Sequence, residues 1–338
     1  MRPSIELDPQ TLRRNAVAWR TYAGVPLLAV VKSDGYGWGV ARAIDALDEV
    51  VDGYCVSDVD EFEFARLFTT KSIATLGDVP LDRIREVLSD GGIPTVSSLE
   101  AVARVRDWSA SQRKRARIRL GLRTAIGWSG IERAEVPAFA RALGEGSVDV
   151  EWWTHLTDPS LEDEQREAFE RATALLRQER VRIVALDVES SAPLARRTTG
   201  TQVRVGVGLF GFRFGAQISV ASALRVRAPV VGRFPARGQL VGYGTQRAPE
   251  RGYLSVVRCG YGDGFPQFAA PQFGVLAVGM QFATYYSGQP SDEGSLELIG
   301  ADTDLDVFAE AAAIAPHELV VRFGLASRAA TATTFALP

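Results

Sequence analysis

The chain contains little cysteine, histidine or methionine: two of each among 338 residues. Cys55 and Cys259 are far apart, and the sequence has neither a Cys-x-x-Cys pair nor a cluster of cysteine with histidine. Zinc sites and disulfide frameworks depend on such spacings. We therefore expect no metal site and no disulfide framework.

Long apolar runs and an excess of charge are also absent. No run approaches the ~20 apolar residues that cross a bilayer, and the first eight residues lack the apolar core of a signal peptide. The formal net charge of −3 gives no reason to expect nucleic acid or an anionic membrane as partner. A cytoplasmic protein with a small-molecule ligand is the expectation.

What is present indicates a globular enzyme-sized protein. Hydrophobic residues make up 46% of the chain and charged residues 23%, which is typical of folded proteins. Single hydrophobic cores stop growing at about 250–300 residues. A chain of 338 residues therefore predicts one large domain and a smaller one.

The first two thirds of the chain alternate between short apolar runs and longer segments with helical spacing. A parallel (β/α)8 barrel of the TIM type is the α/β fold that this alternation predicts, because the count of runs reaches eight. An open doubly wound sheet is the alternative, but no GxGxxG follows the first run. The eight predicted strands are residues 27–32, 53–56, 72–76, 93–96, 116–122, 148–154, 182–188 and 203–210.

The pattern changes after about residue 222. Short β-prone runs separated by glycine and proline follow, and helical spacing persists only at 305–314. We expect a barrel over residues 9–222 and a smaller, mainly β domain over 223–338, joined by residues 1–8.

Lys32 ends the first predicted strand, where barrels carry their active sites. By itself, a lysine at a strand end usually reaches solvent. The next seven residues, 33–39, contain three glycines, which let the backbone approach a ligand closely. In a partly buried mouth the amine can lose its proton, and a neutral amine is what Schiff-base chemistry requires.

The loops after the seventh and eighth strands offer a phosphate site, as they do in many barrels. The Ser191 hydroxyl and the backbone N–H groups of Gly206 and Val207 could bind an anion. Alone, these residues fit a capping serine and a glycine-rich bend equally well. A lysine on one side of the barrel mouth and a phosphate cradle on the other is the layout that pyridoxal 5′-phosphate requires.

Four segments resemble motifs of the alanine racemase family, and they occur in the family's order. Residues 29–39 (AVVKSDGYGWG) are similar to the cofactor-lysine motif AVVKANAYGHG, and residues 259–266 (CGYGDGFP) to the signature GYADG. Residues 153–155 (WTH) resemble the THF segment, and 203–211 (VRVGVGLFG) resemble VRPGIALYG. The resemblance runs from about residue 4 to about residue 325, and it implies a homodimer with shared active sites.

The resemblance implies two acid/base groups for racemisation. Lys32 would hold the cofactor and act on one face of the substrate, and Tyr261 of the other subunit would act on the opposite face. His155 would support Tyr261 and link it to Arg204, which would face the pyridine nitrogen. Because arginine keeps its proton, that nitrogen would stay unprotonated.

The resemblance also implies the remaining contacts. Tyr36, Ser191 and the backbone of Gly206 and Val207 would hold the phosphate, and the N–H of Gly279 would approach the substrate carboxylate.

Several positions depart from the family pattern. The lysine and arginine of the fifth-strand motif K-x-DTGMxRxG are Gly121 and Trp128, so both members of one charged unit are missing. Arg123 is the candidate to replace that arginine in binding substrate, and Trp128 would suit a bulkier or less polar amino acid. Met280 replaces an aspartate near the substrate, and His317 replaces a phosphate-binding tyrosine that it could still imitate.

Three functions remain open at this point. An amino-acid racemase or epimerase is favoured by Lys32, Tyr261 and Arg204 together. A pyridoxal phosphate enzyme of a specialised pathway could run another reaction at the α-carbon, for example decarboxylation. A pyridoxal phosphate-binding protein without turnover would need Lys32 but would have no use for Tyr261 or His155.

Overall fold

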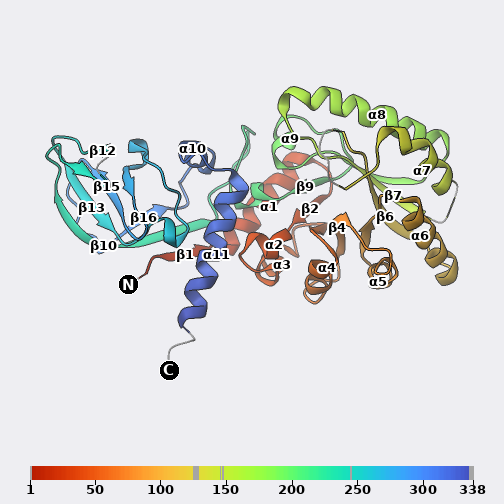
Figure 1. Cartoon of the computed structure of the whole chain (residues 1–338), viewed down its shortest axis with the longest axis horizontal. Helices are drawn as coiled ribbons and strands as arrows, with labels where there is room; N and C mark the ends of the chain where they lie inside the picture. Colours follow the sequence, from red (N-terminus) through yellow and green to blue (C-terminus); the bar gives the residue numbers. More distant parts are fainter. Residues whose placement is uncertain (1, 125–128, 145, 147, 244–245, 335–338) are drawn as a thin grey trace.

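The computed structural model describes residues 2–124, 129–144, 146, 148–243 and 246–334. Figure 1 shows the parallel barrel at one end of the molecule and antiparallel strands at the other, with helix α11 (Pro316–Thr334) between them. Among the described residues, no helix has both the length and the apolar character needed to cross a membrane.

The barrel is confirmed. Eight parallel strands pair in the order β8-β7-β6-β5-β4-β3-β2-β9, and one parallel bridge from Asp187 to Gln202 links β8 with the start of β9. The open doubly wound alternative is therefore wrong. The strands are β2 (Leu27–Val30), β3 (Gly53–Val56), β4 (Ser72–Asp78), β5 (Ile93–Thr95), β6 (Ala116–Gly121), β7 (Val148–Trp153), β8 (Ile183–Asp187) and β9 (Val203–Val205).

Helices cover the outside of the barrel and follow its strands. The eighth strand is shorter than predicted, because Gly206 leaves the extended conformation (φ −114°, ψ −94°) and begins the 3-10 turn η3 (Val207–Phe210). The helices are α1 (Pro9–Ala23), α2 (Lys32–Tyr36), α3 (Val40–Leu47), α4 (Val59–Arg66), α5 (Ile84–Ser89), α6 (Leu99–Gln112), α7 (Val136–Leu143), α8 (Glu162–Gln178) and α9 (Ser191–Arg196).

The interior of the barrel is charged where β6 to β9 meet. Glu151 accepts from Arg117 at 2.8 Å and from Arg119 at 3.4 Å, and Asp187 binds Arg119 at 2.7 Å and Arg204 at 2.8 Å. Four of these five side chains are at most 2% exposed. The arginines lie on the outer two of these strands, β6 and β9, and the carboxylates lie on β7 and β8 between them, so each buried charge has an opposite partner that compensates its loss of water.

The second sheet is antiparallel and strand-rich, as predicted. Strand β1 from the N-terminus pairs with β10, which supports the expectation that residues 1–8 join this part of the chain; the domain boundary at residue 222 stays a prediction. Its strands are β1 (Ser4–Leu7), β10 (Leu224–Pro235), β13 (Tyr253–Val257), β14 (Val275–Val278), β15 (Ala283–Ser287) and β16 (Ser295–Ile299), with the separate pair β11 (Leu240–Val241) and β12 (Gln246–Arg247).

Two helices follow these strands, and the second was not predicted. α10 (Leu305–Ala311) matches the expected helical segment, whereas nothing indicated α11. α11 buries Leu319, Val320 and Phe323, and the Trp38 indole donates to the Val320 carbonyl at 3.2 Å. Its packing partners are therefore distant in sequence, so the local pattern did not reveal it.

Helix α1 connects the barrel wall to η3. Asp8 caps the helix by accepting from the N–H groups of Gln10 and Thr11, and Gly24 ends it with a φ of 66°. Trp19 on its inner face is fully buried, and its indole donates to the Gly208 carbonyl at 2.9 Å. The helix therefore helps to hold the glycine-rich segment that follows β9.

We expect Trp19→Phe to destabilise the protein by about 1–3 kcal/mol, because the buried Gly208 carbonyl loses its donor. Urea unfolding measures this change. Val17→Ala is the control on the same helix, since Val17 is 46% exposed and its loss should change stability by less than about 0.5 kcal/mol. Equal stabilities of the two variants would contradict the expectation.

Candidate active site

A cavity of about 350 Å³ opens at the carboxyl ends of the barrel strands. Its volume lies in the range of small-molecule sites, about 300–1,000 Å³. Its lining includes eight residues predicted from the sequence, namely Lys32, Tyr36, His155, Ser191, Arg204, Gly206, Val207 and His317. The fold thus brings together residues that lie as far apart in sequence as 32 and 317.

Strand β2 ends at Val30, two residues earlier than predicted, and Lys32 follows Val31 as the first residue of α2. Burial lowers the pKa of its amine, and the nearby Arg204 guanidinium lowers it further, although Glu61 opposes both effects. The neutral form of the amine is therefore more accessible than in a surface lysine.

A left-handed turn follows Lys32. Ser33, Asp34, Gly35 and Tyr36 all have positive φ, between 52° and 62°. Side chains with a Cβ rarely adopt this conformation, and such strain gathers at functional sites.

Surrounding groups hold this turn in place. The Asp34 carboxylate accepts from the Val40 N–H at 2.8 Å and forms an ion pair with Arg328 of α11. The Asp34 N–H donates to Glu61 at 3.2 Å. The turn therefore depends on contacts with α11 and α4, and the sequence did not reveal these contacts.

The predicted phosphate end is tightly packed. A Cβ on Gly206 would lie 2.2 Å from the Tyr36 hydroxyl, so only glycine fits there. The Ser191 hydroxyl oxygen accepts from the N–H groups of Gly206 at 3.2 Å and Gly208 at 3.4 Å, which leaves its hydrogen available to another acceptor. The His317 ring stacks on Tyr36 with a centroid distance of 6.1 Å.

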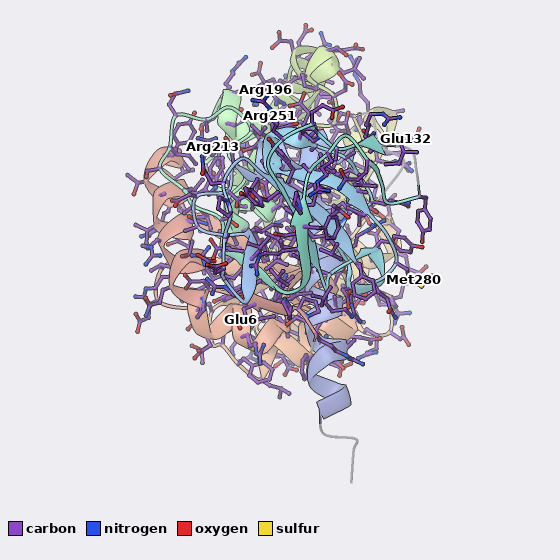
Figure 2. All side chains as sticks on the ribbon, turned by 90° about the vertical axis from the view of Figure 1, so that its left-hand side faces the viewer. Glu6, Glu132, Arg196, Arg213, Arg251 and Met280 are labelled. Atoms are coloured by element: carbon purple, nitrogen blue, oxygen red, sulfur yellow. The ribbon has the colours of Figure 1, made fainter. Side chains whose placement is uncertain are left out.

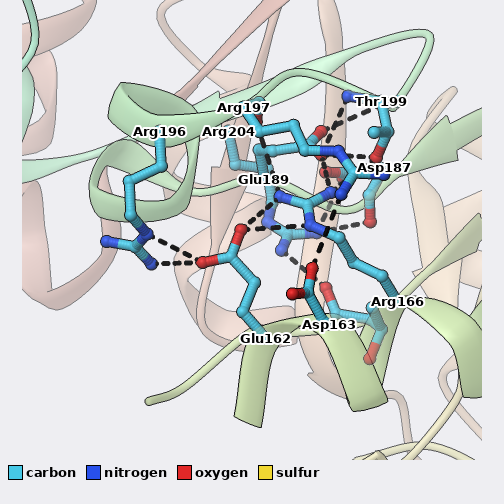
Figure 3. Close-up of polar contacts among 11 residues, drawn as sticks. Glu162, Asp163, Arg166, Asp187, Glu189, Arg196, Arg197, Thr199 and Arg204 are labelled. Carbon is cyan, nitrogen blue, oxygen red and sulfur yellow. Dashed lines mark hydrogen bonds and ion pairs between the residues drawn. The ribbon is translucent and has the colours of Figure 1, made fainter. Parts of the chain in front are cut away.

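Figure 3 shows a buried ionic cluster that includes Glu189, two residues before helix α9 begins at Ser191. The Glu189 carboxylate is fully buried and accepts from Arg166, from the Thr199 N–H and hydroxyl, and from the Gly200 N–H. Arg166 also binds Glu162 at 2.7 Å. This cluster fixes the segments before and after α9, and in the sequence its members appear only as isolated charges.

Arg204 lies in the cavity wall and is 2% exposed. Its guanidinium binds Asp187 at 2.8 Å, donates to the Thr154 carbonyl at 2.9 Å and lies over the Trp153 ring, 5.1 Å from its centroid. Burial first, and then the charges of Arg204 and Lys32, lower the pKa of His155 to about 4. His155 is therefore a neutral hydrogen-bonding group near pH 7.

A family model described as "Alanine racemase, N-terminal domain" matches residues 7–213. The chain belongs to the alanine racemase family. The alanine racemase of Streptococcus pyogenes serotype M6 is 27% identical over 283 residues, which cover 78% of this chain and 76% of that protein.

Solved alanine racemases share the fold. The structure from the D-cycloserine-producing Streptomyces lavendulae has a TM-score of 0.77 at 24% identity and covers 96% of this chain and 95% of that one. The structure from Acinetobacter baumannii has a TM-score of 0.81 at 18% identity, with coverage of 95% and 97%. The structure from Bartonella henselae, described as having covalently bound pyridoxal phosphate, has a TM-score of 0.76 at 18% identity, with coverage of 96% and 98%.

At the position of the family's fifth-strand lysine, an indole fills the space. A Cβ on Gly121 would lie 2.7 Å from the Trp153 ring, so no lysine side chain fits beside it. Trp153 also contacts Arg119, whose guanidinium lies 5.2 Å from the ring centroid. Trp128, at the family's arginine position, lies outside the described residues.

Three further predicted residues are apart from the cavity within this chain. Arg123 does not line it and binds Glu132 at 3.1 Å instead. Tyr261 and Met280 lie together beyond β13, where the Tyr261 N–H donates to the Gly279 carbonyl. Met280 is 56% exposed at the periphery of the molecule (Figure 2).

The Gly279 N–H, predicted to approach substrate, donates to the Phe282 carbonyl at 2.8 Å. Since Tyr261, Gly279 and Met280 do not line the cavity, a single chain does not unite the whole predicted site.

We expect stability to fall as the pH drops below 6.5. The unfolded chain takes up a proton on His155 between pH 6.5 and about 4, whereas the folded protein does not. The contribution is fully present above pH 6.5 and is lost through this window, up to about 3 kcal/mol. Urea unfolding at about pH 7.5 and about pH 5 measures the loss. His155→Gln should lose less stability than the wild type over this interval, and an identical loss in both would contradict the assignment.

Proposed function

We propose that this protein is a pyridoxal phosphate-dependent amino-acid racemase that uses Lys32 and Tyr261 as its two acid/base groups. One observation carries the proposal. A half-buried lysine amine with a lowered pKa shares a cavity with Ser191, Gly206 and a buried arginine. Membership in the alanine racemase family supports the same reaction class.

The residues present fit pyridoxal phosphate. Ser191 and the backbone at Gly206 form a cradle too tight for any side chain on Gly206. His317 beside Tyr36 adds a hydrogen-bonding group at the position where the family pattern has tyrosine. Arg204, which lines the same cavity, would face the ring nitrogen.

When bound, pyridoxal phosphate supplies the electron sink that stabilises negative charge at the substrate α-carbon. Lys32 holds a proton on one face of that carbon, and its lowered pKa makes the transfer accessible near neutral pH. Arg204 would donate a hydrogen bond to the ring nitrogen without giving up its proton. An unprotonated ring nitrogen would make the cofactor a weaker electron sink for the α-carbon. Return of the proton to that carbon would then be favoured over other reactions.

Tyr261 would serve the opposite face from the second subunit of a homodimer. The support is that Tyr261 does not line the cavity of its own chain. A two-fold symmetric dimer repeats each contact, so two cavities would each receive one tyrosine. Gly279 and Met280 would enter the partner's site together with Tyr261, because the Gly279 carbonyl accepts from the Tyr261 N–H and the Met280 carbonyl accepts from the next N–H, that of Gly262.

The substrate would be an amino acid other than alanine, bulkier or less polar. Losing a carboxylate-binding arginine weakens recognition by ~1.5–3 kcal/mol, and Gly121 with the Trp153 ring replaces charge by an apolar surface. We expect larger amino acids to be turned over faster than alanine. Proton NMR in D2O measures loss of the α-hydrogen signal for each amino acid, and chiral analysis separates racemisation from one-sided exchange.

If alanine proved the best substrate by a wide margin, the substrate assignment would be wrong. Loss of the carboxyl group would indicate decarboxylation. Cofactor binding without exchange for any amino acid would favour a binding protein.

Mixing two inactive variants tests the shared site. We expect Lys32→Ala and Tyr261→Phe each to abolish racemisation, whereas their mixed dimer regains one intact site. After joint refolding, activity should return to roughly one quarter of the wild-type value, because half of the dimers are mixed and each has one working site. Each variant refolded alone is the control. Absence of recovery in a mixture shown to contain mixed dimers would place both groups in one chain.

A further inference from the structure

We propose that Asp187 is a positioning residue, which fixes the guanidinium of Arg204 in the orientation that meets the cofactor ring nitrogen. The inference rests on the proposed function. It assigns a role to a residue at the end of β8 that neither lines the cavity nor belongs to the motifs of the family resemblance.

The geometry allows Asp187 to act only through other side chains. It is 0% exposed and absent from the cavity lining, whereas Arg204 lies in that lining. Oδ2 of Asp187 is 2.8 Å from Nη1 of Arg204 and 2.7 Å from Nη2 of Arg119. Figure 3 shows Asp187 and Arg204 beside the ionic cluster of Glu189.

Asp187 supplies the only anion that the described residues place on Arg204. The other contacts of that guanidinium are the Thr154 carbonyl, the Asp187 carbonyl at 3.5 Å and the face of Trp153. Backbone carbonyls and a ring face attract a guanidinium less strongly than a carboxylate does. Without the carboxylate, Arg204 would keep its charge but lose the contact that selects one rotamer.

Arg119 in turn fixes Asp187. Its guanidinium is 0% exposed and reaches Glu151 at 3.4 Å, and Glu151 also accepts from Gln202 at 3.0 Å. Arg119 thus binds the same oxygen of Asp187, Oδ2, that binds Arg204, and this second charged contact holds the carboxylate in place. Arg119 lies two residues before Gly121 on β6, on the strand that has lost the family's lysine.

The chain offers a matched pair of variants. Asp187→Asn and Glu151→Gln each remove one buried carboxylate that binds Arg119, but only Asp187 also binds Arg204. Both should destabilise the protein, so thermal unfolding serves as the folding control. The discriminating measurements are the dissociation constant of pyridoxal phosphate and the ¹⁵N NMR signal of ¹⁵N-labelled cofactor in the protein.

D187N should raise the dissociation constant about tenfold or more, as expected for loss of a hydrogen bond to a charged group, and should shift the ring ¹⁵N signal. E151Q should leave the signal in place and change the constant by less than about twofold. Arg204→Gln should shift the signal in the same direction as D187N. The double variant D187N/R204Q should add no further shift, because Asp187 acts through Arg204.

The inference would be overturned if D187N and E151Q had the same dissociation constant and the same ring ¹⁵N signal. It would also be overturned if the ¹⁵N shifts of D187N and R204Q added up in the double variant. Either result would leave the proposed function intact. Failure of the wild type to bind pyridoxal phosphate would overturn both. Should D187N not fold, R119Q/D187N removes one cation with the anion and keeps the buried charges balanced. R119Q alone, which leaves the Asp187–Arg204 pair in place, is then the matched control, and equal signals in these two variants would overturn the inference.

Discussion

One carboxylate oxygen, Oδ2 of Asp187, binds two buried guanidinium groups at the floor of the cavity. Breaking a buried ion pair leaves an uncompensated charge, which is far more costly than the pair is stabilising. The pairing therefore requires β6, β8 and β9 to stay in register around it. The bridge from Asp187 to Gln202 is also where the barrel comes nearest to closing. Barrel closure and the position of Arg204 thus depend on the same residue.

A second ionic cluster lies on the other side of the same strand end. Glu189, two residues after Asp187, binds Arg166 of α8 and the backbone of residues 199 and 200. The Arg204 N–H donates to the Glu189 carbonyl at 3.0 Å. Within residues 187–189, Asp187 therefore binds charges inside the barrel and Glu189 binds α8 and the segment after α9. Together these contacts hold the segment that leads to Ser191 against β9. A site supported in this way keeps its geometry without a bound ligand.

The absence of the family's lysine at position 121 leaves no void on β6. The Trp153 ring lies where a side chain on residue 121 would be, and two guanidinium groups lie within 5.2 Å of its centroid. Protein interiors tolerate substitution when the total volume is conserved. The barrel therefore keeps its packing while the wall beside the cofactor position becomes aromatic.

The sequence by itself determined the barrel, because eight apolar runs fix eight strands and each strand end carries its residue to the same rim. Lys32, Ser191, Arg204 and Gly206 followed from that rule and from motif order. The tertiary structure alone decided which charges meet inside, since Arg119, Asp187 and Glu189 look like ordinary polar positions until the strands close. It also decided α11, whose buried face packs against Phe265 and against Trp38, which is 282 residues from Val320. Local patterns encode burial, but pairing between distant charges is settled only by packing.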